Sequence, residues 1–247
     1  MKLIVQEAPA LKAAVESIVS LVEEGVFEVK KDGLYLRAMD PSQISMVSFF
    51  MPKEAFLEYQ LEEDRRVGVD ITQLSSILGR GKRGEKAELS VDEGRLVVQF
   101  SADKRKRTFR VPLLEVGEGA QKEPKIEFAS NVKITADAFK ETLKDAKLVS
   151  SHVRLMLDPK SFTVDVKGDS GDVHAVFDNG SNEVSEIKTS SGARSTFPLQ
   201  YLEDIVKASG SSSPITINIE TDKPLKLEYE VEGAKVVYYL APRIESD

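Results

Sequence analysis

The sequence predicts an α+β fold made of two similar domains, each with antiparallel sheets and two helices packed on one face. Three observations lead to this expectation. An apolar pattern recurs at a constant offset of 128 residues, which carries Leu11 and Val15 onto Phe139 and Leu143. The helical patterns are short, and several strand patterns joined by hairpin signals separate them. A polar segment near the midpoint lies between the two copies, as expected for a duplicated unit.

The first copy opens with an amphipathic helix over 10–22, because Leu11, Val15, Ile18 and Val22 recur at helical spacing. Further elements are expected in this order: strands 26–29, 34–38 and 45–51, helix 71–78, a glycine-rich turn 79–84, and strands 87–91, 95–100 and 108–114.

The segment 116–124 lacks periodicity and contains two glycines and a proline, which is typical of a linker. We therefore expect an N-terminal domain over 1–116, a connector over 117–125 and a C-terminal domain over 126–247. After an initial strand, the second copy repeats the order with helix 136–148, strands 153–157, 161–167 and 172–178, helix 199–208, and strands 214–220, 225–231 and 234–240.

The composition excludes several classes of protein. With 41% hydrophobic and 30% charged residues, the chain is expected to be soluble and globular. The absence of cysteine excludes a disulfide framework, a thiolate metal site and a thiol nucleophile. The N-terminus turns polar too soon for a signal peptide, and no apolar run is long enough to span a membrane. We therefore expect an intracellular protein without membrane contact.

Two motifs suggest enzymes, but their contexts argue against both. Gly79–Gly84 fits G-x-G-x-x-G, yet a helix precedes it and a strand follows, the reverse of a dinucleotide site. Gly168–Gly171 resembles the serine segment of trypsin-like proteases, but neither His152 nor His174 has a triad context. The two histidines also lack metal-ligand spacing. The sequence therefore predicts no catalytic residue, no cofactor and no metal.

Cations recur on or beside every predicted helix, although the formal net charge is −7. Lys140, Lys144 and Lys147 form a stripe beside the apolar face of the third helix. The other members of this set are Lys12, Arg80, Lys82, Arg83 and Lys207. Such cations suit contact with phosphate, which needs charge rather than a fixed geometry. Ordinary helix solubility remains the alternative at this point, and Glu16, Glu203 and Asp204 dilute the pattern.

A second basic run, Lys104–Arg107, leads into the last strand of the first copy. It suits phosphate contact, protection of a sheet edge, or pairing with acids of another subunit. Glu141, Asp145 and Asp172 of the second copy are candidate acids. A basic edge in one half and acids in the other favour head-to-tail association, which can close into a ring.

Three segments carry a family resemblance that spans the chain. They are LRAMDPSQISM at 36–46, FPLQYL at 197–202 with Lys207-Ala208, and YYLAPRI at 238–244. Together they resemble sliding clamps of the proliferating cell nuclear antigen family, with an archaeal-like C-terminus.

The resemblance implies a DNA polymerase sliding clamp, a non-catalytic ring of three subunits around duplex DNA. Helices line the hole, sheets form the outer wall, and the DNA sequence is not read. The subunits are copies of one chain or sister clamp subunits. A clamp loader opens the ring, and DNA polymerase, flap endonuclease and DNA ligase dock through peptide motifs. The location is cytoplasmic, or nuclear in a eukaryote. The alternatives are a monomeric adaptor and a metal-dependent DNA-processing enzyme.

The resemblance also assigns residues. Lys12, Lys144 and Lys207 match DNA-facing positions. The peptide-docking set comprises Met39, Gln43, Ile44, Met46, Ala120, Pro198, Tyr201, Pro224, Tyr239, Ala241, Pro242 and Arg243. The subunit-interface set comprises Lys104, Arg105, Arg107, Phe109 and Arg110 on one edge, and Glu141, Asp145, Asp172, Val176 and Asp178 on the other. The connector departs from the family pattern, because Ala120 and Pro124 are almost its only apolar residues.

Overall fold

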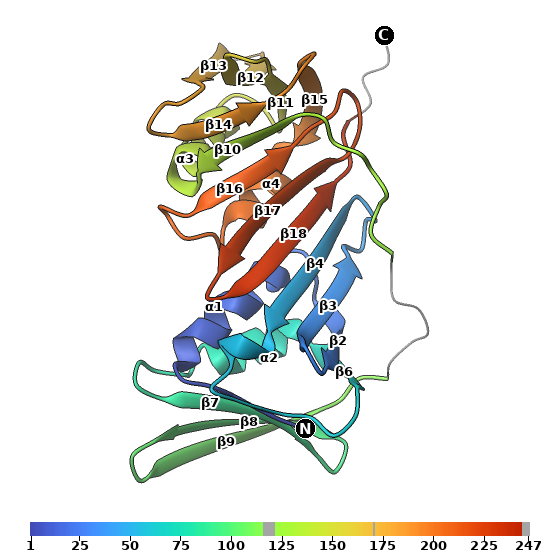
Figure 1. Ribbon diagram of the computed structural model, residues 1–247, viewed down its shortest axis with the longest axis vertical. Helices are drawn as coiled ribbons and strands as arrows, with labels where there is room; N and C mark the ends of the chain where they lie inside the picture. Colours follow the sequence, from blue (N-terminus) through green and yellow to red (C-terminus); the bar gives the residue numbers. More distant parts are fainter. Residues whose placement is uncertain (116–121, 170, 244–247) are drawn as a thin grey trace. The chain divides into compact units, whose positions relative to one another are not determined.

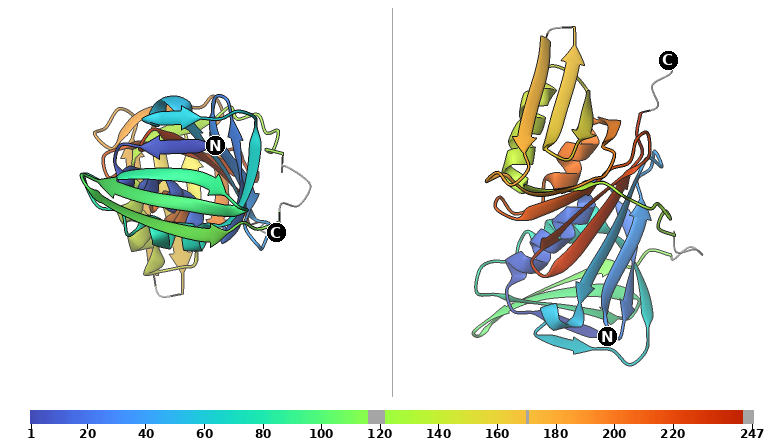
Figure 2. Two further views of the ribbon diagram at one scale, coloured as in Figure 1. Left: turned by 90° about the horizontal axis from the view of Figure 1, so that it is seen from below. Right: turned by 45° about the horizontal axis from the view of Figure 1, so that its top comes forward.

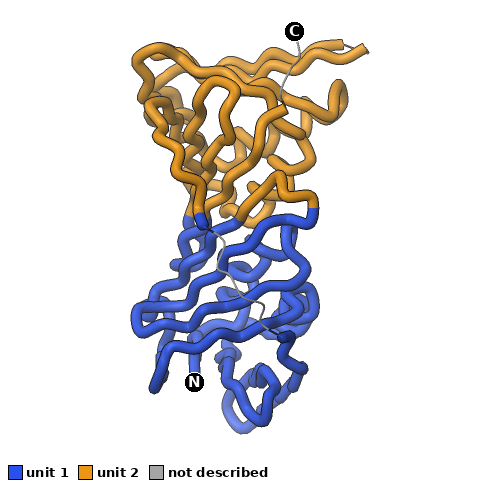
Figure 3. Tube along the Cα trace, turned by 90° about the vertical axis from the view of Figure 1, so that its right-hand side faces the viewer, with its two compact units in different colours: residues 1–41, 47–122, 230–236 blue, residues 42–46, 123–229, 237–247 orange. Residues whose placement is uncertain are grey.

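The computed structural model describes residues 1–115, 122–169 and 171–243, and the chain divides into two compact units (Figures 1 and 3). Unit 1 comprises Met1–Pro41, Val47–Lys122 and Glu230–Val236, and unit 2 comprises Ser42–Met46, Glu123–Tyr229 and Val237–Asp247. Each unit combines antiparallel strands with two α-helices, so the predicted α+β class is confirmed.

The chain up to residue 115 forms two helices and two runs of paired strands. Its elements are β1 (Lys2–Val5), α1 (Ala8–Val19), β2 (Glu24–Lys30), β3 (Gly33–Met39), β4 (Ser45–Pro52), the 3₁₀ turn η1 (Lys53–Ala55), β5 (Glu58–Gln60), β6 (Arg65–Asp70), α2 (Ile71–Leu78), β7 (Lys86–Asp92), β8 (Arg95–Ala102) and β9 (Arg105–Pro112). One sheet has the order β5-β1-β7-β8-β9, and β4-β3-β2-β6 are neighbours in another. The strands β7, β8 and β9 run side by side in Figure 1 and in the left-hand view of Figure 2.

The chain from residue 122 onward repeats this plan. Its elements are β10 (Asn131–Thr135), α3 (Ala136–Lys147), β11 (His152–Leu157), β12 (Ser161–Gly168), β13 (Gly171–Asp178), β14 (Val184–Lys188), β15 (Ala193–Pro198), α4 (Leu199–Val206), β16 (Pro214–Asn218), β17 (Leu225–Val231) and β18 (Ala234–Leu240). The strands β13-β12-β11-β15 form one sheet, and β14-β10-β16-β17-β18 are neighbours in another.

The predicted offset of 128 residues is confirmed by the element boundaries. Helices α1 and α3 begin 128 residues apart and also end 128 residues apart. The same holds for α2 and α4 and for β6 and β15. Equal lengths and equal spacing place equivalent side chains at equivalent positions of the two helix pairs. The two halves can therefore be compared residue by residue.

The apolar stripe of each first helix is buried against its own unit. In α1 this stripe includes Leu11, Val15 and Ile18, each at most 1% exposed. In α3 it includes Phe139 and Leu143, both fully buried. Residues spaced by three and four share one face of a helix, so burial of this face leaves the intervening charged residues on its flanks and on the opposite side.

Several predicted boundaries were wrong for identifiable reasons. Helix α1 begins at Ala8 rather than residue 10, because Pro9 is tolerated in a first turn. It ends at Val19 rather than residue 22, since Leu21 and Val22 are buried in the following turn and prolong the apolar pattern. Helix α3 ends one residue before the predicted limit, and α4 ends two residues before it.

The sequence reading also missed strands. It omitted β1, β5, β6, β14 and β15; of these, β1 and β5 have only four and three residues, and β6 opens with exposed Arg65 and Arg66. Strand β9 begins at Arg105 instead of residue 108, because the basic run pairs with β8 and is not a loop. Strand pairing holds these segments extended although their own alternation is weak.

The buried stripe predicts a large effect at Phe139. Phe139→Ala removes a fully buried ring that lies 6.3 Å from the Phe162 ring, so the free energy of unfolding should fall by about 3–5 kcal/mol. Urea unfolding followed by circular dichroism measures this. Leu148→Ala, at a side chain that is 81% exposed, serves as the control and should change stability by less than about 0.5 kcal/mol. Equal losses of unfolding free energy in the two variants would contradict the assignment of Phe139 to the core.

Candidate nucleic-acid interface and docking surfaces

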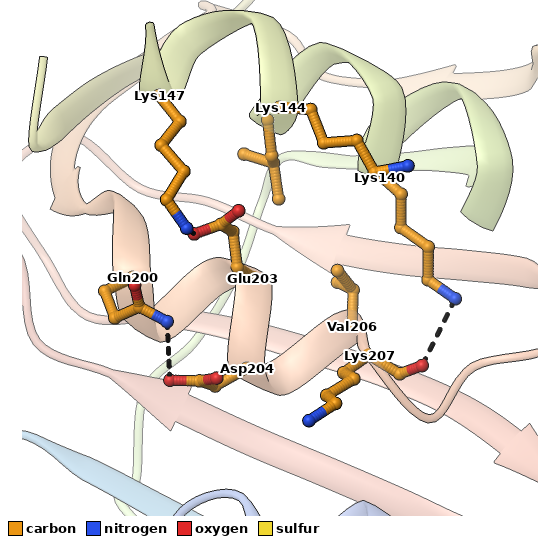
Figure 4. A pocket seen from close by; sticks show the side chains of 9 residues that line it. Lys140, Lys144, Lys147, Gln200, Glu203, Asp204, Val206 and Lys207 are labelled. Atoms are coloured by element: carbon orange, nitrogen blue, oxygen red, sulfur yellow. Dashed lines mark hydrogen bonds and ion pairs between the residues drawn. The ribbon is translucent and has the colours of Figure 1, made fainter.

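Helices α3 and α4 of unit 2 pack against each other and form a groove of about 340 Å³ between them (Figure 4). The polar residues that line it are Lys140, Lys144, Lys147, Gln200, Glu203, Asp204 and Lys207. The structure thus brings together four of the eight predicted DNA-facing cations. The acids Glu203 and Asp204 lie among them, so the groove is not uniformly positive.

Two of these lysines form exposed ion pairs. Lys147 Nζ lies 2.8 Å from Glu203 Oε2 and so links α3 to α4. Lys144 Nζ lies 2.6 Å from Glu141 Oε1 within α3, and this hydrogen bond raises the pKa of Lys144. Exposed pairs of this kind contribute little stability and exchange readily with solvent ions. Both ammonium groups therefore remain accessible to an incoming anion.

Lys140 is held differently. Its Nζ donates to the backbone carbonyl of Ser209 at 2.6 Å and, at 3.4 Å, to that of Lys207. The side chain is half-buried, and burial lowers the pKa of Lys140. Lys207 itself is exposed, and its ammonium extends away from the carbonyl that Lys140 contacts (Figure 4).

Unit 1 presents the remaining predicted cations on α1 and on the turn after α2. Lys12 Nζ lies 2.8 Å from Glu16 Oε1, one helical turn further along α1. Arg80, Lys82 and Arg83 are exposed on the turn. Two acids hold the turn's backbone: the Lys82 amide donates to Glu85 at 2.9 Å, and the Gly84 amide donates to Glu7 at 2.8 Å. The three cations are therefore carried by a fixed backbone.

Glu85 is a buried acid that sequence reasoning missed. Its Oε2 accepts from Arg107 Nη2 at 2.5 Å, and the same nitrogen donates to the Arg80 carbonyl at 2.9 Å. Burial alone would raise the pKa of Glu85, but the Lys82 amide and the Arg107 guanidinium outweigh it and lower the pKa. A single acid before a strand is usually solvated, so the sequence gives no signal for this role.

Arg107 belongs to the predicted subunit-interface set, but its guanidinium lies within its own chain. Besides Glu85 it contacts Phe100, whose ring centre is 5.1 Å from Cζ. The Phe109 ring meets the same Phe100 ring edge-on at 5.9 Å. Lys104, Arg105 and Arg110 are exposed. Within the described residues, β9 is the last strand of its sheet, so its outer edge has no strand neighbour.

The predicted acidic partner surface lies on β13 and α3 of unit 2. In the described part of the chain, β13 is also an edge strand. Asp172 and Asp178 are exposed on it, and Val176 is 51% exposed, which is unusual for a large apolar side chain. Glu141 and Asp145 are exposed on α3, with Glu141 already paired to Lys144.

Part of the predicted peptide-docking set is joined by hydrogen bonds in unit 2. Tyr239 Oη donates to Glu123 Oε2 at 3.2 Å, which ties the end of the connector to β18. The Ala241 amide donates to the Ile44 carbonyl at 2.8 Å. Gln43, next to Ile44, is exposed and has a φ of 59°. The hydrogen bond to Glu123 was not anticipated, because that acid lies in a segment without periodicity.

The remaining members of this set lie on several elements. Pro198 is the N-cap of α4, and Tyr201 is half-buried on its first turn. Met39 ends β3, Met46 is buried in β4, and Pro224 precedes β17. Pro242 and Arg243 follow β18, and the Arg243 amide donates to the Thr196 carbonyl at 2.8 Å. Ala120 lies outside the described residues.

Neither histidine contributes to a recognisable reaction centre. His174 Nδ1 lies 3.0 Å from Asp165 on the neighbouring strand, and His152 Nδ1 lies 3.0 Å from Ser151. Ser170 of the protease-like segment lies outside the described residues. Over residues 1–115, 122–169 and 171–243, no three histidine or acidic side chains are grouped to hold a metal ion. No described helix is long and apolar enough to cross a membrane.

Known proteins match this chain over nearly its full length. Models of the proliferating cell nuclear antigen family match it twice, the N-terminal domain over residues 1–116 and the C-terminal domain over residues 122–244. A protein of Methanococcus maripaludis (strain C6) named DNA polymerase sliding clamp is 40% identical over 241 residues, which cover 95% of this chain and 96% of the relative.

Solved structures agree with the sequence matches. PCNA from Thermococcus kodakaraensis has a TM-score of 0.93 at 24% identity, covering 98% of this chain and 99% of that one. A. fulgidus PCNA bound to the C-terminal region of FEN-1 has a TM-score of 0.89 at 31% identity, covering 100% and 99%. With two helix pairs on antiparallel sheets and a family match over each half, the chain belongs to the proliferating cell nuclear antigen family.

Proposed function

We propose that this protein is a DNA polymerase sliding clamp, a ring of three subunits that encircles duplex DNA and catalyses no reaction. The observation that carries the proposal is the family match over both halves, each of which bears a helix pair with cations on the helices or on the turn that follows them. Lys12, Lys144 and Lys207 face DNA in this proposal, with the cations of the turn Arg80–Arg83 beside them. The protein acts where genomic DNA lies, which is the cytoplasm of an archaeal cell.

In this proposal, two sheet edges of opposite charge on each subunit join the subunits into a ring. Strand β9 carries exposed Arg105 and Arg110, and β13 carries exposed Asp172 and Asp178. Two edge strands can pair through their free backbone groups, and unlike edges produce a head-to-tail contact that closes after a fixed number of copies. In this proposal the domain boundaries are those predicted, 1–116 and 126–247, with the connector between them.

A ring holds DNA by topology, so its lining needs only weak and salt-sensitive contact. The exposed ion pairs of Lys12 and Lys144 suit this role, because a phosphate can exchange with the paired carboxylate at little cost. The acids of the remaining surface account for the net charge of −7. Weak contact with phosphates alone also makes the clamp indifferent to base sequence.

Client enzymes dock through peptide motifs in this proposal. One family member was solved with the C-terminal region of FEN-1. Here Tyr239, Ile44 and Ala241 form the centre of the docking surface. The hydrogen bond from Tyr239 to Glu123 fixes the end of the connector beside them. DNA polymerase, the clamp loader and DNA ligase are expected to compete for the same surface.

The oligomeric state tests the ring. Three chains of 27.3 kDa give about 82 kDa, which light scattering on a sizing column should report at micromolar concentration. Arg105→Glu with Arg110→Glu should yield a species near 27.3 kDa, since like charges then face each other across the edge. Adding Asp172→Lys and Asp178→Lys should restore the larger mass. A wild-type monomer that also fails to assemble with sister subunits would favour a monomeric adaptor instead.

The lining is tested by removing its cations. Lys12→Ala, Lys144→Ala and Lys207→Ala together should lower the amount of clamp loaded onto nicked circular DNA by about threefold or more, because three phosphate contacts to the entering duplex are lost. The ring mass should not change. The control triple Lys133→Ala, Lys188→Ala and Lys226→Ala removes the same charge from strands β10, β14 and β17. Equal amounts of loaded clamp for both triples would remove the three helix lysines from the lining.

The docking surface is tested with a peptide that copies the C-terminal region of FEN-1. Tyr239→Ala should weaken its binding about tenfold or more in calorimetry, since tyrosine is a frequent hot-spot residue of interfaces. Tyr239→Phe keeps the ring, removes the hydroxyl that donates to Glu123 and should cost less than about threefold. The control Tyr35→Ala changes a tyrosine on β3 outside the docking set and should have no effect. Unchanged affinity in Tyr239→Ala would exclude this surface.

A further inference from the structure

The C-terminal end of α4 is held by side chains from three other elements or turns. Tyr229 Oη of β17 donates to the Ile205 carbonyl at 2.9 Å. Ser209 Oγ donates to the Val206 carbonyl at 2.6 Å. Lys140 of α3 donates to the next carbonyls, those of Lys207 and Ser209. The last carbonyls of a helix lack partners inside it and carry a partial negative charge, so a cation here is favourable.

The equivalent helix end of unit 1 is closed mainly by its own backbone. Gly79 and Arg80 donate their amides to the Ser75 and Ile77 carbonyls, both at 2.9 Å. Lys12, the residue 128 positions before Lys140, also lies over this end. Its Cε is 3.6 Å from where a Cβ on Gly79 would stand. Its ammonium, however, pairs with Glu16 rather than with carbonyls.

The two equivalent lysines have different hydrogen-bond partners. Lys12 lies beside a helix end that backbone amides already satisfy, and its ammonium pairs with the Glu16 carboxylate. Lys140 is half-buried, and its ammonium bonds the carbonyl of Lys207, the residue that caps α4. If the Lys140 ammonium moved toward a phosphate, the carbonyls of Lys207 and Ser209 would lose this donor.

We infer that Lys140 is a positioning residue for DNA contact, which fixes the end of α4 and with it the ammonium of Lys207. Lys207 makes the phosphate contact, and Lys140 acts only through it. The inference rests on the proposed function, because it assumes that this helix pair faces DNA. The alternative is that every helix lysine, Lys140 included, makes its own phosphate contact.

A double-mutant cycle tests the inference on the full chain. The quantity measured is the affinity for a fluorescein-labelled linear duplex at low salt, followed by anisotropy. Lys140→Met keeps the aliphatic stem and removes the donors, and it should weaken binding about fivefold in the wild-type background. In the Lys207→Ala background the same change should weaken binding by less than about 1.5-fold, because the residue that it positions is already gone.

The matched cycle uses Lys144, whose ammonium bonds Glu141 and no residue of α4. Lys144→Ala and Lys207→Ala should multiply their separate effects, as independent phosphate contacts do. A merely structural role of Lys140 would lower the midpoint of thermal unfolding without the non-additivity on DNA. If Lys140→Met does not give the wild-type mass on a sizing column, Lys140→Gln replaces it in the same cycle.

The outcomes are distinct. Multiplicative effects of Lys140→Met and Lys207→Ala would show that Lys140 contacts phosphate itself, and the inference would be wrong. No effect of Lys140→Met on DNA affinity would also overturn it, while leaving the clamp function intact. If the wild-type protein neither binds the duplex nor stays on nicked circular DNA, the proposed function fails and the inference fails with it. A five-fold loss that vanishes in the Lys207→Ala background supports it.

Discussion

The burial of one stripe on each first helix is the interaction on which the rest of the structure depends. Leu11 and Val15 in α1, and Phe139 and Leu143 in α3, are removed from water against their own units. This burial fixes the rotation of each helix about its axis. A helix has 3.6 residues per turn, so that rotation decides which charged residues face outward and which reach the neighbouring helix. The placement of every helix lysine follows from it.

Once the rotation is fixed, the partner of each lysine determines its role. Lys144 and Lys12 meet carboxylates of their own helices, Lys147 bridges to α4, and Lys140 ends on carbonyl oxygens. Four lysines on two equivalent helices thus have three different kinds of partner. The same principle applies to arginine, since Arg107 turns inward to a buried acid while its neighbours on β9 stay exposed.

The duplicated plan, the four helices of the described residues and the cation positions could be predicted from the sequence, because apolar periodicity reports directly on burial. The strands β6 and β15 could not, since β6 opens with exposed Arg65 and Arg66 and depends on pairing with β2. The environments of Glu85 and Lys140 could not be predicted either. Each depends on a residue at least 22 positions away, and a local pattern contains no information on such contacts.

With Lys144 facing DNA as proposed, its ion pair with Glu141 has a consequence for motion along the duplex. A bare cation facing DNA gathers mobile ions and gives an entropic gain when a phosphate displaces them. A cation with a carboxylate tethered on the same helix gives a smaller gain, because the displaced partner stays attached to the chain. The resulting energy wells along the duplex are shallow and closely spaced. In the proposed clamp, friction along the duplex is therefore low, and thermal diffusion suffices to carry the ring along the helix axis.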